Sequence, residues 1–141
     1  MSSDPNKIVN LAFVCLDWRL HPQVEEYFTK SGDGCDACVT AGSVKGLIDE
    51  STRDFLLEQI SISLELHNCR KVILTMHADC GAYGGTSSFD GPAAENDHHK
   101  RILDEASAIV AGKFPELTVE KYIIGMEKID KDWKIDPQRI S

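Results

Sequence analysis

Short apolar runs alternate with longer amphipathic stretches, and this alternation is what most constrains the fold of the chain. Residues 8–15 and 71–76 are nearly continuous apolar runs, partly β-branched, which predict strands buried on both faces of a sheet. Residues 49–67 and 96–111 instead place apolar side chains about one helical turn apart, which predicts helices. Strands that alternate with helices form parallel sheets covered by helices, so we expect an α/β fold.

Weaker signals complete the predicted sheet. Residues 36–40 and 119–126 each resemble a short strand, and Pro22 favours the start of a helix after the first strand. The charged tail at 127–141 is expected to add an edge strand with a frayed end. The prediction is a mostly parallel sheet of four or five strands with helices on both faces, in one domain over residues 1–141.

Two other segments lead to specific expectations. Residues 81–97 contain four glycines and predict a long loop, of the kind that is often functional. His98 and His99 follow this loop at the start of a predicted helix, where we expect them to be solvated. In the tail, Trp133 and Ile135 are the candidate anchors to the core.

Composition excludes several classes of function. The 141 residues carry a formal net charge of −8 without a basic cluster, which argues against a nucleic-acid partner. No apolar run approaches the roughly 20 residues needed to cross a bilayer, so no membrane partner is expected. Residues 1–5 lack the features of a secretory signal, and we expect a cytoplasmic protein.

Two short motifs at the ends of predicted strands carry the candidate chemistry. CLDWR at residues 15–19 follows the first strand, and HADCG at residues 77–81 follows the third. Because the carboxyl ends of parallel strands meet at one edge of a sheet, the thiols and the imidazole of these motifs are expected to converge. Such soft ligands suit zinc, and a carboxylate that can leave would open a place for water. The candidate ligands are Cys15, His77 and Cys80, with Asp17 as the candidate fourth ligand.

A C-x-x-C pair, Cys35 and Cys38, is the other candidate for a functional site. It could be a redox pair or half of a second zinc site. A redox pair normally opens a helix, however, whereas this one precedes a predicted strand, and a four-thiol zinc site would need a second such pair. With five cysteines and no secretory signal, we expect no disulfide framework, and we interpret Cys38 and Cys69 as core residues.

With both motifs in this order, the chain resembles the β-class carbonic anhydrases. That family carries Cys-x-Asp-x-Arg after its first strand and His-x-x-Cys-Gly after a later one. The stretch at residues 36–42 and the helix leading into residues 71–74 extend the resemblance over most of the chain, although only the two motifs are specific. The chain differs from the family in three respects: Trp18 replaces the usual serine, the chain is shorter than typical members, and no N-terminal helical arm is expected.

The resemblance implies a zinc lyase, a carbonate dehydratase that reversibly hydrates carbon dioxide to bicarbonate through a zinc-bound hydroxide. Cys15, His77 and Cys80 would bind Zn²⁺. Asp17 would either fill the fourth position or pair with Arg19 and leave that position to water, which makes Asp17 and Arg19 the expected catalytic pair. The family also forms dimers, so a homodimer or a higher homo-oligomer is expected.

Three alternatives stay open. The first is a hydrolase of carbonyl sulfide or carbon disulfide on the same zinc site, because Trp18 could reshape the pocket for more apolar linear substrates. The second is a non-catalytic zinc-binding protein in which Asp17 closes a four-ligand shell. The third is a nucleotide-binding module of similar topology, since one fold hosts many functions.

Overall fold

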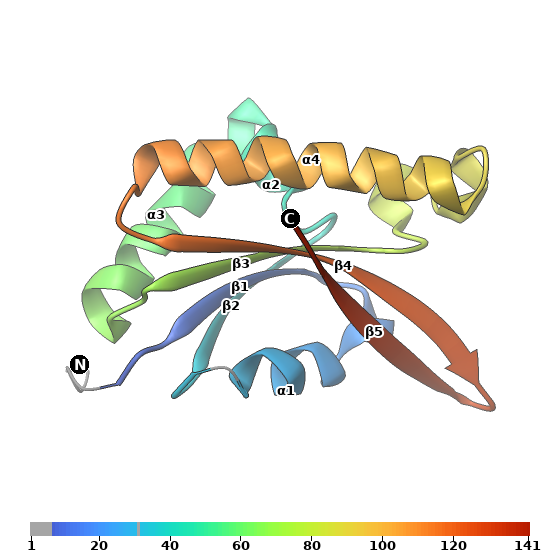
Figure 1. Ribbon diagram of the computed structural model, residues 1–141, viewed down its shortest axis with the longest axis horizontal. Coiled ribbons are helices and arrows are strands. Elements are labelled where there is room, and N and C mark those ends of the chain that lie inside the picture. The colour runs from blue at the N-terminus through green and yellow to red at the C-terminus, as the bar shows by residue number, and fades with distance from the viewer. Residues whose placement is uncertain (1–6, 31) are drawn as a thin grey trace.

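A five-stranded sheet forms the centre of the protein in the computed structural model, which describes residues 7–30 and 32–141 (Figure 1). The strand order is β2-β1-β3-β4-β5, and every neighbouring pair is parallel except β4 and β5. The predicted mostly parallel sheet is therefore confirmed, with five strands. The strands are β1 (Asn10–Cys15), β2 (Cys35–Thr40), β3 (Lys71–His77), β4 (Thr118–Ile129) and β5 (Asp132–Ile140).

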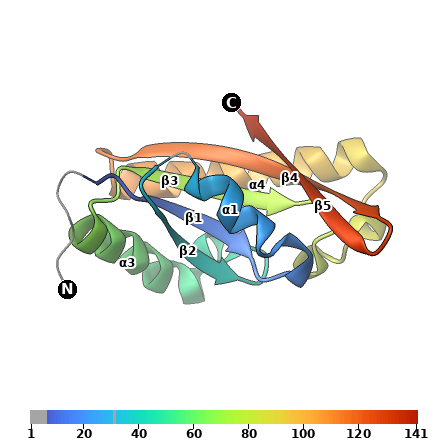
Figure 2. The same cartoon turned by 90° about the horizontal axis from the view of Figure 1, so that it is seen from below.

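Helices cover both faces of the sheet, as the sequence predicts (Figures 1 and 2). One face packs against α1, and the other packs against α2, α3 and α4. The helices are α1 (Gln23–Thr29), α2 (Lys45–Ile48), α3 (Glu50–His67) and α4 (Pro92–Lys113), with short 3₁₀ turns η1 (Trp18–Leu20), η2 (Gly81–Tyr83) and η3 (Thr86–Ser88). No helix among the described residues is both long enough and apolar enough to cross a bilayer.

β1 shows why its sequence is apolar throughout. It lies between β2 and β3, and all six of its residues are buried. Because side chains alternate along a strand, Leu11 and Phe13 pack on the α3 and α4 side, whereas Ala12 and Val14 pack on the α1 side. A strand with a hydrophobic layer on each face needs apolar residues at every position.

The largest departure from the sequence-based prediction lies at residues 81–97. Instead of one long loop, this segment contains η2, η3 and the start of α4, which begins at Pro92 rather than at residue 96. Proline suits the first turn of a helix because its fixed φ is helical and it lacks an N–H that would be unpaired there. The N-terminal residues 1–5, in which the sequence analysis finds no secretory signal, lie outside the described residues.

The C-terminal tail forms a regular strand. β4 continues to Ile129, beyond the predicted end at residue 126, because β5 pairs with residues 121–129 of β4, for example Lys128 with Trp133. The expected edge strand is therefore confirmed, whereas the expected frayed end is wrong, because β5 continues to Ile140. β5 turns back toward η1 and α1, and it packs against both (Figure 2).

Candidate metal centre

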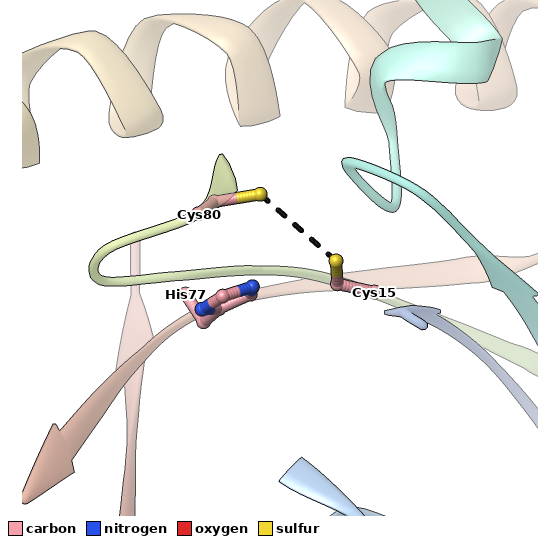
Figure 3. Close-up of side chains that lie close together, drawn as sticks. All are labelled: Cys15, His77 and Cys80. Carbon is pink, nitrogen blue, oxygen red and sulfur yellow. Dashed lines mark hydrogen bonds between the residues drawn. The ribbon is translucent and has the colours of Figure 1, made fainter. Parts of the chain in front are cut away.

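Cys15, His77 and Cys80 meet at the edge of the sheet where β1 and β3 end (Figure 3). Cys15 is the last residue of β1, His77 is the last residue of β3, and Cys80 directly precedes η2. One donor atom from each residue lies within 4.8 Å of the other two, and all three side chains are buried. The structure thus brings together three residues that the two motifs place far apart in the sequence.

The spacing of these atoms fits a tetrahedral divalent ion. The two Sγ atoms lie 3.9 Å apart. Two thiolates that bind zinc at about 2.3 Å with a tetrahedral angle lie roughly 3.8 Å apart. His77 Nδ1 lies 2.7 Å from the carbonyl oxygen of Ala78, and a carbonyl only accepts, so Nδ1 carries the proton. The Nε2 lone pair is therefore left available, and Nε2 is buried with no hydrogen-bond partner within the described residues.

Hydrogen bonds favour a negative charge on the sulfur of Cys15. Its pKa lies well below the ordinary value, mainly because of the contact with Cys80, and the backbone N–H groups of Asp17 and Gly42 act in the same direction. The same contact raises the pKa of Cys80. Gly42 adopts a φ of +77°, and a Cβ there would lie 2.9 Å from the Cβ of Lys45. Both the backbone conformation and the close contact with Lys45 therefore require a glycine at this position.

Asp17 and Arg19 form an ion pair beside this cluster. Arg19 Nη2 donates to Asp17 Oδ2 at 2.7 Å, and Nε donates to both carboxylate oxygens at 3.1 Å. These bonds hold the pKa of Asp17 below its usual range, so the carboxylate stays ionised. Asp17 Oδ2 lies 3.8 Å from His77 Nε2, but the residue is not one of the three in the compact donor cluster. Of the two arrangements expected for Asp17, the structure shows pairing with Arg19.

The sequence matches the family described as "Putative carbonic anhydrase" over residues 5–137, which is nearly the whole chain. The chain belongs to this carbonic anhydrase family. The resemblance to carbonic anhydrases that rested on two short motifs is thereby confirmed.

Two proteins of similar sequence are both named as uncharacterized proteins. One, from Rickettsia conorii, is 27% identical over 132 residues, which span 88% of this chain and 71% of the relative. Another, from Rickettsia bellii, is 26% identical and matches 88% of this chain and 80% of the relative. The names of these relatives assign no reaction.

A solved structure of a β-carbonic anhydrase shares the fold. The β-carbonic anhydrase CcaA superposes with a TM-score of 0.50 at 15% identity, over 84% of this chain and 75% of CcaA. The β-carbonic anhydrase CafD of Aspergillus fumigatus gives a TM-score of 0.46 at 15% identity, over 86% of this chain and 85% of CafD. The predicted β-carbonic-anhydrase-like fold class is confirmed by the first of these.

A cleft of about 810 Å³ opens onto the candidate metal centre of this carbonic anhydrase family member. Cys15 and Asp17 lie in its wall, and the exposed side chains of Leu16 and Trp18 also line it. Among the described residues that line the cleft, Arg19 is the only cationic side chain, and its charge is paired with Asp17. The cleft therefore presents an apolar opening and no free positive charge.

The loop that carries Cys80 is fixed by residues that the sequence analysis largely missed. Glu95 of α4 is buried and accepts hydrogen bonds from the backbone N–H of Asp79 and from the hydroxyl of Thr86. Asp79 in turn accepts from the N–H of Thr86, as expected of a loop carboxylate, but it also pairs with Arg19. If α4 had been predicted to begin at Pro92, Glu95 would fall in its first turn, where an acidic residue is favoured, and it could have been identified as a candidate.

His99 is buried, and its expected solvation is wrong. Because α4 begins earlier than predicted, His99 lies more than a turn inside the helix and faces β3. Its Nε2 lies 3.0 Å from the carbonyl oxygen of His77 and donates to it, and burial lowers the pKa of His99. His98 is half-buried against the rings of Tyr83 and Phe89. His99 therefore supports the end of β3, and His98 packs beside it.

Cys35 and Cys38 do not form a site. They lie on β2 and pack in different hydrophobic clusters, Cys35 on the α1 side of the sheet and Cys38 on the other side. Burial raises the pKa of each thiol to about 11, so both are neutral near pH 7. The prediction that Cys38 is a core residue is supported, and Cys69 is fully buried as expected.

Proposed function

We propose that the protein is a zinc-dependent carbonic anhydrase that reversibly hydrates carbon dioxide to bicarbonate. The observation that carries this proposal is the buried cluster of Cys15, His77 and Cys80 in a member of a carbonic anhydrase family. Two thiols and one imidazole, with a carboxylate turned aside next to them, are a ligand set that leaves a fourth position for chemistry. Five unpaired cysteines are compatible with the reducing cytoplasm, where we expect the protein to work.

The three clustered residues would hold Zn²⁺. The lowered pKa of Cys15 and the free lone pair of His77 Nε2 prepare these donors for a cation. Bound zinc supplies the Lewis acidity that makes water a nucleophile near neutral pH. Arg19, by pairing with Asp17, keeps the carboxylate from completing the ligand shell.

Asp17 would then serve as a hydrogen-bond acceptor. Its carboxylate is ionised because Arg19 lowers its pKa, and it lies 3.8 Å from His77 Nε2 at the edge of the cluster. An ionised carboxylate can only accept hydrogen bonds. Asp17 would therefore orient the reacting water by accepting a hydrogen bond from it. Asp17 and Arg19 are therefore the proposed catalytic pair.

The cleft favours a small neutral substrate. Its apolar rim, with Leu16 and Trp18, suits an apolar linear molecule such as carbon dioxide. The charge of Arg19, the cationic side chain in the described lining of the cleft, is already paired with Asp17. Within the described residues, the cleft therefore has no free positive charge that would retain an anionic product such as bicarbonate.

Stopped-flow measurement of carbon dioxide hydration by zinc-loaded protein tests the proposal. We expect a rate well above that of buffer at some pH up to about 8.5, because the nucleophile forms near neutral pH. Arg19→Ala should retain zinc but lose turnover, because Asp17 is then free to close the ligand shell. Cys38→Ser is the matched thiol control and should retain activity. A hydration rate no greater than that of buffer throughout this pH range would reject the proposal.

Hydrolysis of carbonyl sulfide or carbon disulfide is the second candidate. The exposed indole of Trp18, at 73% exposure, makes the rim more apolar than the serine of the resembled family would. The same zinc-loaded protein should be assayed for sulfide release from both gases. Sulfide release that greatly exceeds bicarbonate formation from carbon dioxide would favour this candidate.

We also propose that the chain forms a homodimer or a higher homo-oligomer. β2 is an edge strand, and the outer face of α3 beside it exposes Phe55, Ile62 and Leu66 one above another along the helix. A second copy of this chain would cover that face. Light scattering after size-exclusion chromatography should show an oligomer for the wild type and a monomer for Ile62→Glu. A monomeric wild type at micromolar concentration would contradict this part of the proposal.

A further inference from the structure

Arg19 contacts a residue near the other end of the chain. Its Cζ atom lies 4.9 Å from the centre of the Trp133 ring, within the range in which a guanidinium is attracted to an aromatic face. Trp133 is on β5, half-buried, and pairs with Lys128 of β4 in the sheet register. The C-terminal hairpin, formed by β4 and β5, thus covers the guanidinium of Arg19.

The edges of the same guanidinium are held by two carboxylates. Besides its bonds to Asp17, Arg19 Nη1 donates to Asp79 Oδ2 at 3.2 Å and Nη2 donates to the backbone carbonyl of Asp79 at 3.0 Å. The Asp79 carboxylate is fixed in turn by the N–H of Thr86 at 2.9 Å. Gly85 leaves room for it, because a Cβ there would lie 2.9 Å from Asp79 Oδ1. Carboxylates at its edges and an indole on one face leave the guanidinium little freedom to turn.

The hairpin that presents Trp133 is itself anchored. Along β5 the side chains of Trp133, Ile135 and Pro137 are partly buried, and those between them are exposed. Ile135 packs on the hydrophobic cluster between the sheet and α1, and β5 also packs against η1, which contains Arg19 (Figure 2). The strand therefore holds the indole at a fixed place over Arg19.

We propose that Trp133 is a positioning residue that holds Arg19 on Asp17 and thereby keeps Asp17 out of the fourth ligand position. This inference rests on the proposed zinc site. Asp17 Oδ2 is already 3.8 Å from His77 Nε2, so a short movement brings it into the cluster once Arg19 releases it. The indole thus favours the arrangement that is open to water over the closed one.

The test compares zinc affinity and the identity of the fourth ligand in the wild type and in three variants of this chain. Trp133→Leu removes the aromatic face, and Trp133→Phe retains a weaker one. Ile135→Ala is the matched control, because it loosens the same face of the same strand but removes no aromatic ring. Zinc affinity is measured by competition with a chelator at one fixed pH, and the fourth ligand is identified in crystals of the zinc-loaded proteins and by the visible spectrum after cobalt substitution.

In Trp133→Leu we expect Asp17 as the fourth ligand, zinc bound up to about fivefold more tightly, and hydration slowed by a similar factor. The rise in affinity distinguishes this role from simple damage to the fold, which would weaken zinc binding. Trp133→Phe should give a smaller shift in the same direction, and Ile135→Ala should give no rise. If Trp133→Leu does not fold, the Trp133→Phe result decides the question.

The outcomes separate this inference from the proposed function. Unchanged or weaker zinc binding in both Trp133 variants, with the wild-type fourth ligand, overturns the role of Trp133 and leaves the proposed function intact. A wild-type protein that binds no zinc overturns the proposed function itself, and the positioning role of Trp133 with it.

Discussion

Two pairs of cysteines in this protein contrast in sequence spacing and in spatial distance. Cys15 and Cys80 are 65 positions apart, yet their sulfur atoms lie 3.9 Å from each other. Cys35 and Cys38 are close neighbours in sequence, yet they pack on opposite faces of the sheet. The difference arises because the first pair follows the ends of adjacent parallel strands, whereas the second pair lies within one strand whose side chains alternate.

The surroundings of the two pairs differ in charge as well as in position. The contact with Cys80, helped by backbone N–H groups, lowers the pKa of Cys15, and the same contact raises the pKa of Cys80. Around Cys35 and Cys38 burial dominates, and it raises the pKa of each to about 11. A cation is therefore favoured at the strand ends and disfavoured along β2.

The largest effect is expected on zinc binding. Cys15→Ser or Cys80→Ser should weaken zinc binding by more than about 100-fold, because each removes a thiolate from a three-residue protein ligand set. Cys38→Ser should retain about one zinc per chain, because Cys38 lies away from the cluster. Metal analysis after dialysis against a weak chelator measures the zinc lost by the ligand variants and the zinc retained by Cys38→Ser. Equal zinc loss in Cys38→Ser and Cys15→Ser would contradict the assignment of the two pairs.

The first pair could be predicted from the sequence because its signals agree. Apolar runs mark β1 and β3 as adjacent buried strands, and the motifs after them place soft ligands at the strand ends. The five-stranded mostly parallel sheet follows from the same runs. The alternation of side chains along β2 also explains why the C-x-x-C pair is structural.

Contacts that depend on distant packing could not be predicted in this way. Trp133 was recognised only as an anchor, because no local pattern indicates that β5 turns back onto η1 and stacks an indole on Arg19. The burial of His99 was missed because it depends on α4 beginning at Pro92, within a glycine-containing segment that reads as a loop. Both features are set by tertiary packing that overrides local propensity.

The second prediction concerns thiol reactivity and its dependence on pH. Since the thiolate is the nucleophile, Cys35 and Cys38 with a pKa of about 11 should react with iodoacetamide at pH 8 roughly 100-fold more slowly than an ordinary exposed thiol. Their rates should rise about tenfold per pH unit up to pH 10. Mass spectrometry of labelled peptides over time provides the rates. Fast labelling of Cys35 at pH 8, without a tenfold rise per unit, would show that burial does not control this thiol.

The smallest effect is expected on stability. Cys38 packs on the larger hydrophobic cluster, so Cys38→Ala should lower the free energy of unfolding by about 1 kcal/mol, as expected for the loss of one partly buried group. Zinc in 100-fold excess over its Kd should stabilise wild type and Cys38→Ala equally, by about 2.7 kcal/mol, and Cys15→Ala hardly at all. Urea unfolding with and without zinc measures all four differences. The comparison within each variant isolates the contribution of the ion, because the packing loss is the same in both conditions. If Cys38→Ala also lost the zinc-dependent stabilisation, the two thiol pairs would be coupled through the sheet, and the division between a metal-binding pair and a packing pair would be wrong.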